Sequence, residues 1–216
     1  MDLPRLSSQR RELLAQATER YAAALVDSPA AEYLEARGIG VQVGESFKLG
    51  YVLDPIEGHE RFRGRLSIPY LTPTGTVGMR FRYPRDELAE HESKYDSDAG
   101  GRTPLYNVRD LHRSEPWIAV CEGELDTVVM SGVVGVPAIG VPGVKHWLKN
   151  GSVWSRLLQD YESVFIVMDP DDAGRKIIRE ISRQVENPVV IDLPADVNDT
   201  VQDKGAEYVL EQLGLD

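Results

Sequence analysis

The second half of the sequence alternates short apolar runs with segments of helical periodicity, and this alternation limits the possible folds more than any other feature. The run Ser163–Met168 is almost entirely apolar, as expected of a strand that is buried on both faces of a parallel sheet. Four strands are predicted, at Trp117–Cys121, Val136–Ile139, Ser163–Met168 and Pro188–Ile191. Helices are predicted from about Glu124, over Asp172–Val185 and near residues 199–213. The pattern predicts an open, Rossmann-like α/β domain with a parallel sheet.

The first half has the pattern of a small α+β unit. Apolar residues recur at helical spacing over residues 8–26, and Ser28 followed by Pro29 is typical of the start of a second helix. Further along, we predict short strands and turns over 41–60, a β-hairpin over 61–85 and a mobile polar loop over 86–104. We therefore place the domain boundary between residues 1–113 and residues 114–216.

The predicted hairpin is strongly basic. It contains six arginines and no carboxylate. Side chains alternate across a strand, so Arg61, Arg63 and Arg65 are expected on one face of the first strand, and Arg80 and Arg82 on one face of the second. If the two sets share a face, they form a compact cationic surface for phosphates. The alternative is a solvated hairpin face without a ligand.

Charge is divided unevenly between the two halves. The net charge is −11 for the chain, −1 over residues 1–113 and −10 over residues 114–216. Such a division indicates two functional halves. By composition alone, an acidic half is most simply a solvated surface. Only the positions of its carboxylates can show whether some of them converge on metal ions.

Several classes of protein are excluded by composition. No run of 18 apolar residues is present, so we expect no membrane span, and the amino terminus lacks the apolar core of a signal peptide. The single cysteine, Cys121, excludes a disulfide framework and a cysteine-rich zinc site, so no zinc is expected in this chain. We expect a cytoplasmic protein.

Two acidic clusters follow predicted strands directly. Glu122 and Asp126 come after the first strand, and Asp169 and Asp171 after the third. Functional groups collect at the carboxyl ends of strands in open α/β sheets, so both clusters are expected on one edge. Carboxylates that lie close together repel unless a cation neutralises them, and oxygen ligands favour Mg²⁺ or Mn²⁺. Helix capping explains either cluster alone but poorly explains the pair.

The sequences CEGELD and FIVMDPDDAGRK resemble the glutamate and DxD motifs of the TOPRIM domain, and LPADVNDTVQDKG resembles the acidic turn of its primase-type members. The segments YLEARGI, FRGRLSIPYLTPTGTVGMRFRY and SKYDSDAGGRTPLYNV resemble, in that order, the basic subdomain of DnaG-type primases of bacteria and phages. The likeness covers about residues 29–213. It implies a primase catalytic core, in which a basic α+β subdomain precedes a TOPRIM domain.

The resemblance also implies roles for individual residues. Glu122, Asp169 and Asp171 match its catalytic carboxylates, and Asp126 and Asp199 would complete the metal shell, with Asp196 in the same acidic turn. Glu122 would be either a ligand or a general base. Arg82, Lys94 and Arg102 match basic residues of the family and would hold phosphates of nucleotide or template, and Arg63 and Arg65 of the basic hairpin would join them.

The implied reaction is synthesis of an RNA primer on single-stranded DNA from ribonucleoside triphosphates, a nucleotidyl transfer that uses two Mg²⁺ or Mn²⁺ ions about 3.5–4 Å apart. The family's zinc-binding and helicase modules do not match any part of this sequence, so a helicase or a separate zinc-binding polypeptide is the expected partner. Two alternatives remain open. One is a TOPRIM nuclease that uses the same carboxylates, and the other is a non-catalytic TOPRIM module that binds replication proteins.

Overall fold

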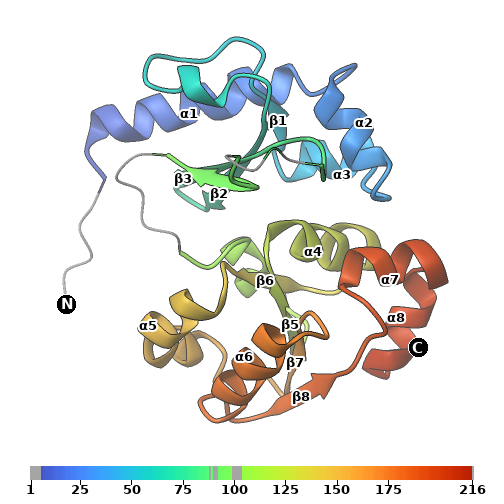
Figure 1. The fold of residues 1–216 in the computed structure, drawn as a ribbon. Coiled ribbons are helices and arrows are strands. Elements are labelled where there is room, and N and C mark those ends of the chain that lie inside the picture. Colours follow the sequence, from blue (N-terminus) through green and yellow to red (C-terminus); the bar gives the residue numbers. More distant parts are fainter. Residues whose placement is uncertain (1–5, 88, 90–91, 99–103, 216) are drawn as a thin grey trace. The chain divides into compact units, whose positions relative to one another are not determined.

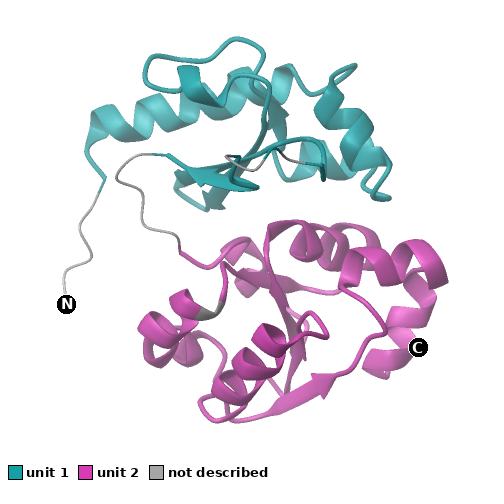
Figure 2. Ribbon diagram, viewed as in Figure 1, with its two compact units in different colours: residues 1–102 teal, residues 103–216 magenta. Residues whose placement is uncertain are grey.

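The computed structural model describes residues 6–87, 89, 92–98 and 104–215, which form two compact units (Figure 2). The units are residues 1–102 and 103–216, so the division comes before the predicted boundary at 113/114. The segment before residue 114 belongs with the second unit because Tyr106 forms a bridge with Gly140, through backbone hydrogen bonds of 2.9 and 3.1 Å. No helix in the described ranges has the length and apolar character needed to cross a membrane.

The first unit is an α+β fold built on an antiparallel sheet with the strand order β1-β2-β3-β4. Its helices are α1 (Ser8–Ala23), α2 (Pro29–Glu35) and α3 (Val41–Ser46), and its strands are β1 (Gly50–Tyr51), β2 (Leu66–Thr72), β3 (Gly75–Arg82) and β4 (Tyr95–Ser97). The Ser28 side chain caps α2 as predicted, accepting the Ala31 N–H at 3.2 Å. Leu14 and Tyr21 of α1 pack with Phe62 and Phe81 in the core of this unit.

Two segments of the first unit differ from the prediction. Residues 41–46 form helix α3 rather than a strand, because Gly44 allows close packing on Leu25, where a Cβ atom would lie 3.1 Å from the leucine side chain. The segment 86–104, predicted as a mobile loop, contains strand β4, which pairs with β3. The Tyr95 ring of β4 lies against the guanidinium groups of Arg80 and Arg82, and this contact explains why so polar a segment forms a strand.

The predicted hairpin is confirmed as β2 and β3, paired from Leu66 opposite Arg82 to Thr72 opposite Gly75. The predicted shared face of Arg61, Arg63 and Arg65 is wrong. These arginines precede β2, in and after a short 3₁₀ turn at Glu60–Phe62, and Gly64 has a φ of 80° that reverses the chain. They therefore follow no strand alternation.

The second unit is a parallel α/β fold, which confirms the predicted class. Its strands are β5 (Trp117–Glu122), β6 (Ala138–Val141), β7 (Ser163–Val167) and β8 (Pro188–Ile191), in the spatial order β6-β5-β7-β8. Its helices are α4 (Glu124–Val129), α5 (Val144–Trp154), α6 (Asp172–Ser182), α7 (Val197–Lys204) and α8 (Ala206–Leu213). Helices α5 and α6 cover one face of the sheet, and α4, α7 and α8 cover the other (Figure 1).

The predicted strands of this unit are found within about two residues, but the helices differ in two places. The single helix predicted near 199–213 is divided into α7 and α8 at Gly205, whose φ of 87° a helix does not allow. Helix α5 was not predicted. Trp147 and Trp154, with ring centroids 5.9 Å apart, bury one side of it against the sheet.

Candidate functional site

The carboxylates predicted to be catalytic follow β5 and β7, two strands that lie side by side. The chain passes from β5 to β6 on one side and later to β7 on the other, so the strand order reverses between β5 and β7. Ligands of open α/β sheets bind at such a switch point, beyond the carboxyl ends of the strands. Cys121 pairs with Val167 of β7, and Glu122, at the end of β5, pairs with Val141 of β6, so Glu122 and Asp169 lie at the carboxyl ends of their strands.

Glu122 has the clearest electrostatic signature at this edge. Burial raises the pKa of its carboxyl, the negative charges of Asp169 and Asp171 act in the same direction, and a backbone hydrogen bond from Asp169 opposes them, so that the pKa is about 7. Its Oε2 atom is buried and has no hydrogen-bond partner in the described part of the chain. Glu122 is therefore a carboxylate whose charge becomes favourable only when a cation is near.

The loop after β7 is held in place by the first turn of α6. The Asp171 carboxylate caps that helix by accepting the Gly174 N–H at 2.7 Å, while the Asp171 N–H donates to the Asp169 carbonyl at 2.8 Å. A Cβ atom on Gly174 would lie 1.9 Å from the Asp169 carbonyl oxygen, so only glycine permits this approach. Helix capping, the simpler explanation of this cluster, is therefore confirmed for Asp171. The cap uses one carboxylate oxygen of Asp171 and does not use the other.

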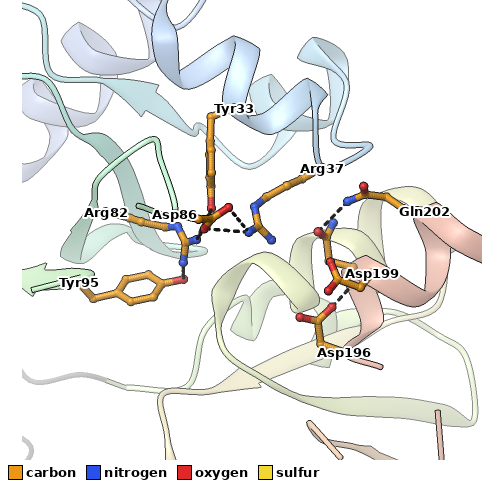
Figure 3. A network of polar contacts seen from close by, with 9 residues as sticks. Tyr33, Arg37, Arg82, Asp86, Tyr95, Asp196, Asp199 and Gln202 are labelled. Atoms are coloured by element: carbon orange, nitrogen blue, oxygen red, sulfur yellow. Dashed lines mark hydrogen bonds and ion pairs between the residues drawn. The ribbon is translucent and has the colours of Figure 1, made fainter. Parts of the chain in front are cut away.

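The second acidic turn lies against the first motif of the same unit. The Asn198 N–H at the start of α7 donates to the Asp126 carboxylate at 3.1 Å. Asp196 caps α7 by accepting the Asp199 N–H at 2.7 Å, and these two residues are labelled in Figure 3. Burial raises the pKa of the Cys121 thiol, and the charges of Asp126 and Asp169 raise it further, so both carboxylates lie within electrostatic reach of the end of β5.

The described residues hold no ready-made cage of three or more histidine, cysteine or acidic side chains for a metal ion. The structure brings Glu122, Asp169 and Asp171 into electrostatic contact, whereas Asp199 lies exposed on the first turn of α7. The buried oxygen of Glu122 and the all-oxygen character of the donors fit a hard cation such as Mg²⁺. The shell predicted from the sequence would need rearrangement of side chains to close around an ion.

A second cluster lies within the first unit and consists of Tyr33, Arg37, Arg82, Asp86 and Tyr95, which we call the arginine–tyrosine cluster (Figure 3). Arg82 is only 2% exposed. Its guanidinium donates to the Tyr95 hydroxyl at 3.0 Å and to Asp86 at 2.7 Å, and contacts the Tyr33 hydroxyl. It lies 5.1 Å from the ring centroids of both tyrosines. Arg82 is thus not a solvated hairpin side chain.

Asp86 joins the two arginines of this cluster. The Arg37 Nη2 atom donates to both Asp86 carboxylate oxygens, at 3.0 and 2.9 Å. Burial acts to raise the pKa of Asp86, but the hydrogen bonds and charge of Arg37, together with Arg82, hold it below the ordinary value. Two guanidinium groups and the Tyr33 hydroxyl around one carboxylate form an arrangement that would equally suit a phosphate oxygen. The sequence analysis missed Tyr33, Arg37, Asp86 and Tyr95.

The other predicted phosphate-binding residues differ in their surroundings. Arg65 is 8% exposed, lies 4.0 Å from the Tyr83 ring centroid and donates to the Tyr83 hydroxyl at 3.1 Å. Arg63 is exposed and donates to the Leu53 carbonyl at 2.6 Å. Lys94 immediately precedes β4, and Arg102 lies outside the described residues.

Comparison with known proteins gives one relative by sequence. No protein-family model matches the chain. The Gene 57 protein of Mycobacterium phage D29 is 29% identical over 159 residues, which cover 70% of this chain and 99% of that protein.

Solved structures give a broader match. The Aquifex aeolicus primase, comprising zinc-binding and RNA polymerase domains, superposes with a TM-score of 0.75 at 22% identity. The match covers 99% of this chain, which spans 63% of the Aquifex chain. A DnaG primase catalytic domain bound to single-stranded DNA matches with a TM-score of 0.69 at 19% identity, over 96% of this chain and 82% of that one. The chain has the fold of a DnaG-type primase catalytic domain. The fold implied by the sequence resemblance is confirmed.

Proposed function

We propose that the chain synthesises RNA primers on single-stranded DNA, as the catalytic core of a DNA primase. The observation that carries the proposal is the meeting of Glu122 with Asp169 and Asp171 at the switch point of a primase-like fold. The DnaG catalytic domain with the same fold was solved with single-stranded DNA, and this supports the template assignment. In chemical terms the protein is a nucleotidyltransferase.

In this proposal Asp169 and Asp171 are the principal ligands of divalent cations, and Asp126 or Asp199 completes the shell. Bound Mg²⁺ would neutralise triphosphate charge and make the primer 3′-hydroxyl more acidic. The carboxyl of Glu122, with a pKa of about 7, can take a proton from that hydroxyl or act as a further ligand. Capping by Asp171 and the close approach of Gly174 fix the loop that carries the ligands.

The arginine–tyrosine cluster would hold a phosphate of the nucleotide or the template. The guanidinium groups of Arg82 and Arg37 both donate to the Asp86 carboxylate, and a bound phosphate would replace that carboxylate as their acceptor. Arg63, Arg65, Lys94 and Arg102 would extend the contact along the polyanion. Affinity for nucleic acid rests on neutralised phosphates, so a chain with a net charge of −11 should bind DNA weakly alone. A helicase or a zinc-binding polypeptide would then supply stable engagement.

The test is primer synthesis on single-stranded DNA with ribonucleoside triphosphates and Mg²⁺ or Mn²⁺. We expect short RNA products that disappear in an Asp169→Asn variant and persist in a variant of an exposed carboxylate away from the site, Glu211→Gln. Shortening of the DNA without RNA synthesis would instead indicate a nuclease. Absence of both activities in the presence of the partner helicase would indicate a binding module.

A further inference from the structure

Helix α5 carries a surface that the proposed function does not use. Three large aliphatic side chains are about half exposed on it and on the 3₁₀ turn at Ser155–Leu157 that continues it: Leu148 at 52%, Val153 at 50% and Leu157 at 48%. Scattered single apolar side chains are ordinary on protein surfaces, whereas a contiguous group marks an interaction site. Val153 and Leu157 are four residues apart and therefore neighbours, while Leu148 is exposed on a different side of the same helix.

Basic residues lie between these aliphatic side chains. Lys145, Lys149 and Arg156 are exposed, and residues 144–158 contain no acidic residue, in a half of the chain with a net charge of −10. At 3.6 residues per turn, Lys145 and Lys149 fall on one line, with Leu148 on one side and Val153 on the other. Within the described ranges, none of the three cations forms an ion pair. We call these six residues the α5 surface.

The opposite side of α5 is fixed firmly. Trp147 is fully buried and Trp154 is 9% exposed, and both belong to the core of the second unit, in which α5 lies against α6 and β6. A Cβ atom on Gly151 would lie 2.5 Å from the Gln184 side chain, so the helix lies close to the segment that follows α6. The α5 surface is therefore presented on a rigid support rather than on a loop.

We propose that the α5 surface is a docking site for a peptide segment of a partner protein that carries both acidic and large apolar side chains. Acidic groups of the segment would lie along Lys145, Lys149 and Arg156, and its apolar side chains would cover Leu148 and Val153. Charge complementarity selects an anionic partner. A peptide is favoured over nucleic acid because single strands bind by stacking on exposed aromatic rings, and both tryptophans of α5 are turned into the core.

The test uses a fluorescent synthetic peptide that alternates aspartate with leucine and phenylalanine, measured by anisotropy against the full chain. Two matched peptides serve as controls, one with lysine in place of aspartate and one with serine in place of the apolar residues. We expect measurable binding of the first peptide only. Weakening of about tenfold or more is expected in Lys145→Glu/Lys149→Glu and in Leu148→Ser/Val153→Ser.

The control variant is Lys204→Glu/Val190→Ser, which changes an exposed cation and an exposed valine outside the α5 surface and should bind the peptide like the parent chain. Circular dichroism melts verify that all variants fold. The proposal is overturned if the three peptides bind alike or not at all. It is also overturned if the lysine variant loses binding to an oligothymidylate instead, or if Leu148→Ser/Val153→Ser only dissociates a dimer of the chain. Because the readout is binding, its result does not depend on primer synthesis.

Discussion

The arginine–tyrosine cluster and the carboxylates at the switch point differ in whether their charges are compensated by neighbouring groups of the fold. In the first, Arg82 is buried among two tyrosine hydroxyls and the carboxylate of Asp86, so its charge is compensated within the fold. In the second, Glu122 is half-buried beside Asp169 and Asp171, and burial together with these like charges raises its pKa to about 7. Internal compensation stabilises a unit on its own, whereas like-charge crowding is tolerated where a ligand brings the opposite charge.

The difference shows which cluster depends on an external ion. Tyr33, Arg37 and Asp86 hold the first cluster together without any ligand, so a ligand there must compete with Asp86. The second cluster gains a favourable interaction when a cation arrives, because Oε2 of Glu122 then acquires a partner. Three measurements can test this contrast, and a fourth tests the buried His59 of the first unit.

The largest expected effect is on catalysis. Asp171→Asn should keep the cap on α6, because an amide oxygen also accepts the Gly174 N–H, but should remove a charge that metal binding requires. Charge stabilisation by a bound metal is worth several kcal/mol, so primer synthesis should fall by roughly 10³-fold. The rate is measured beside a thermal melt. Activity within threefold of the parent would remove Asp171 from the site.

The next effect is a loss of stability of the first unit at acidic pH. His59 is buried, with Nδ1 3.0 Å from the Tyr21 hydroxyl and Nε2 3.4 Å from Asp98. Burial lowers the pKa of His59, the charges of Arg10 and Arg61 act in the same direction and Glu60 opposes them, so that the pKa falls from 6.5 to about 4. Because the pKa of His59 is lower in the folded chain than in the unfolded one, burial of the neutral imidazole does not reduce stability above pH 6.5. As the pH falls from 6.5 toward 4, the unfolded chain takes up the proton first, and the free energy of unfolding falls by on the order of 3 kcal/mol.

The check is the free energy of urea unfolding between pH 7 and pH 4, compared with His59→Gln, which does not titrate. The pH dependence of the parent should be the steeper of the two over this window. Equal slopes would show that His59 takes up its proton in the folded chain as readily as in the unfolded one.

A smaller effect is expected from divalent cations. Binding to the folded state alone should add about 1–3 kcal/mol of stability at roughly 10–100 times the dissociation constant of Mg²⁺. Because the pKa of Glu122 is about 7, protons compete with the metal at pH 6, so the increase in melting temperature should be greater at pH 8. The triple variant Glu122→Gln/Asp169→Asn/Asp171→Asn should show no increase. An equal increase in that variant would place the cation elsewhere.

The smallest effect concerns Asp86. Its side chain is 59% exposed, so its pairing with Arg37 and Arg82 is worth only about 0.5–1 kcal/mol. Asp86→Asn should therefore strengthen binding of a ribonucleoside triphosphate about two- to fivefold, by freeing both guanidinium groups. Calorimetric titration measures this, with Asp54→Asn, which removes an exposed partner of Arg20, as the matched control. Weaker binding in Asp86→Asn would mean that Asp86 positions the arginines instead of competing for them.

The sequence predicted the second unit better than the first, for a physical reason. Glu122 and Asp169 each follow an apolar run directly, and in a parallel sheet that local pattern places both at one edge. Tyr33, Arg37, Asp86 and Tyr95 carry no such local pattern, because the cluster depends on contacts between distant segments. The hairpin illustrates both cases, since its turn at Thr72–Gly75 is local whereas the surroundings of Arg65 depend on Tyr83.

Helix α5 and strand β4 were missed for the same reason. Helix α5 begins after Gly143, which has a φ of 92°. Its buried side is formed by Trp147 and Trp154, and their burial depends on contacts with the rest of the unit rather than on a local sequence pattern. Strand β4 is short and polar, and it forms because Tyr95 meets two arginines of β3.

The contact between Gly174 and the Asp169 carbonyl has a consequence for how this site tolerates variation. Any side chain at position 174 would push the first turn of α6 away from the loop that carries Asp169 and Asp171. In a saturation mutagenesis screen for primer synthesis, the glycine should therefore be as intolerant as the carboxylates, although it contributes no functional group. Such a screen would not distinguish a glycine with a purely structural role from a carboxylate that takes part in the reaction. A metal-binding measurement on Gly174→Ala would distinguish these two roles.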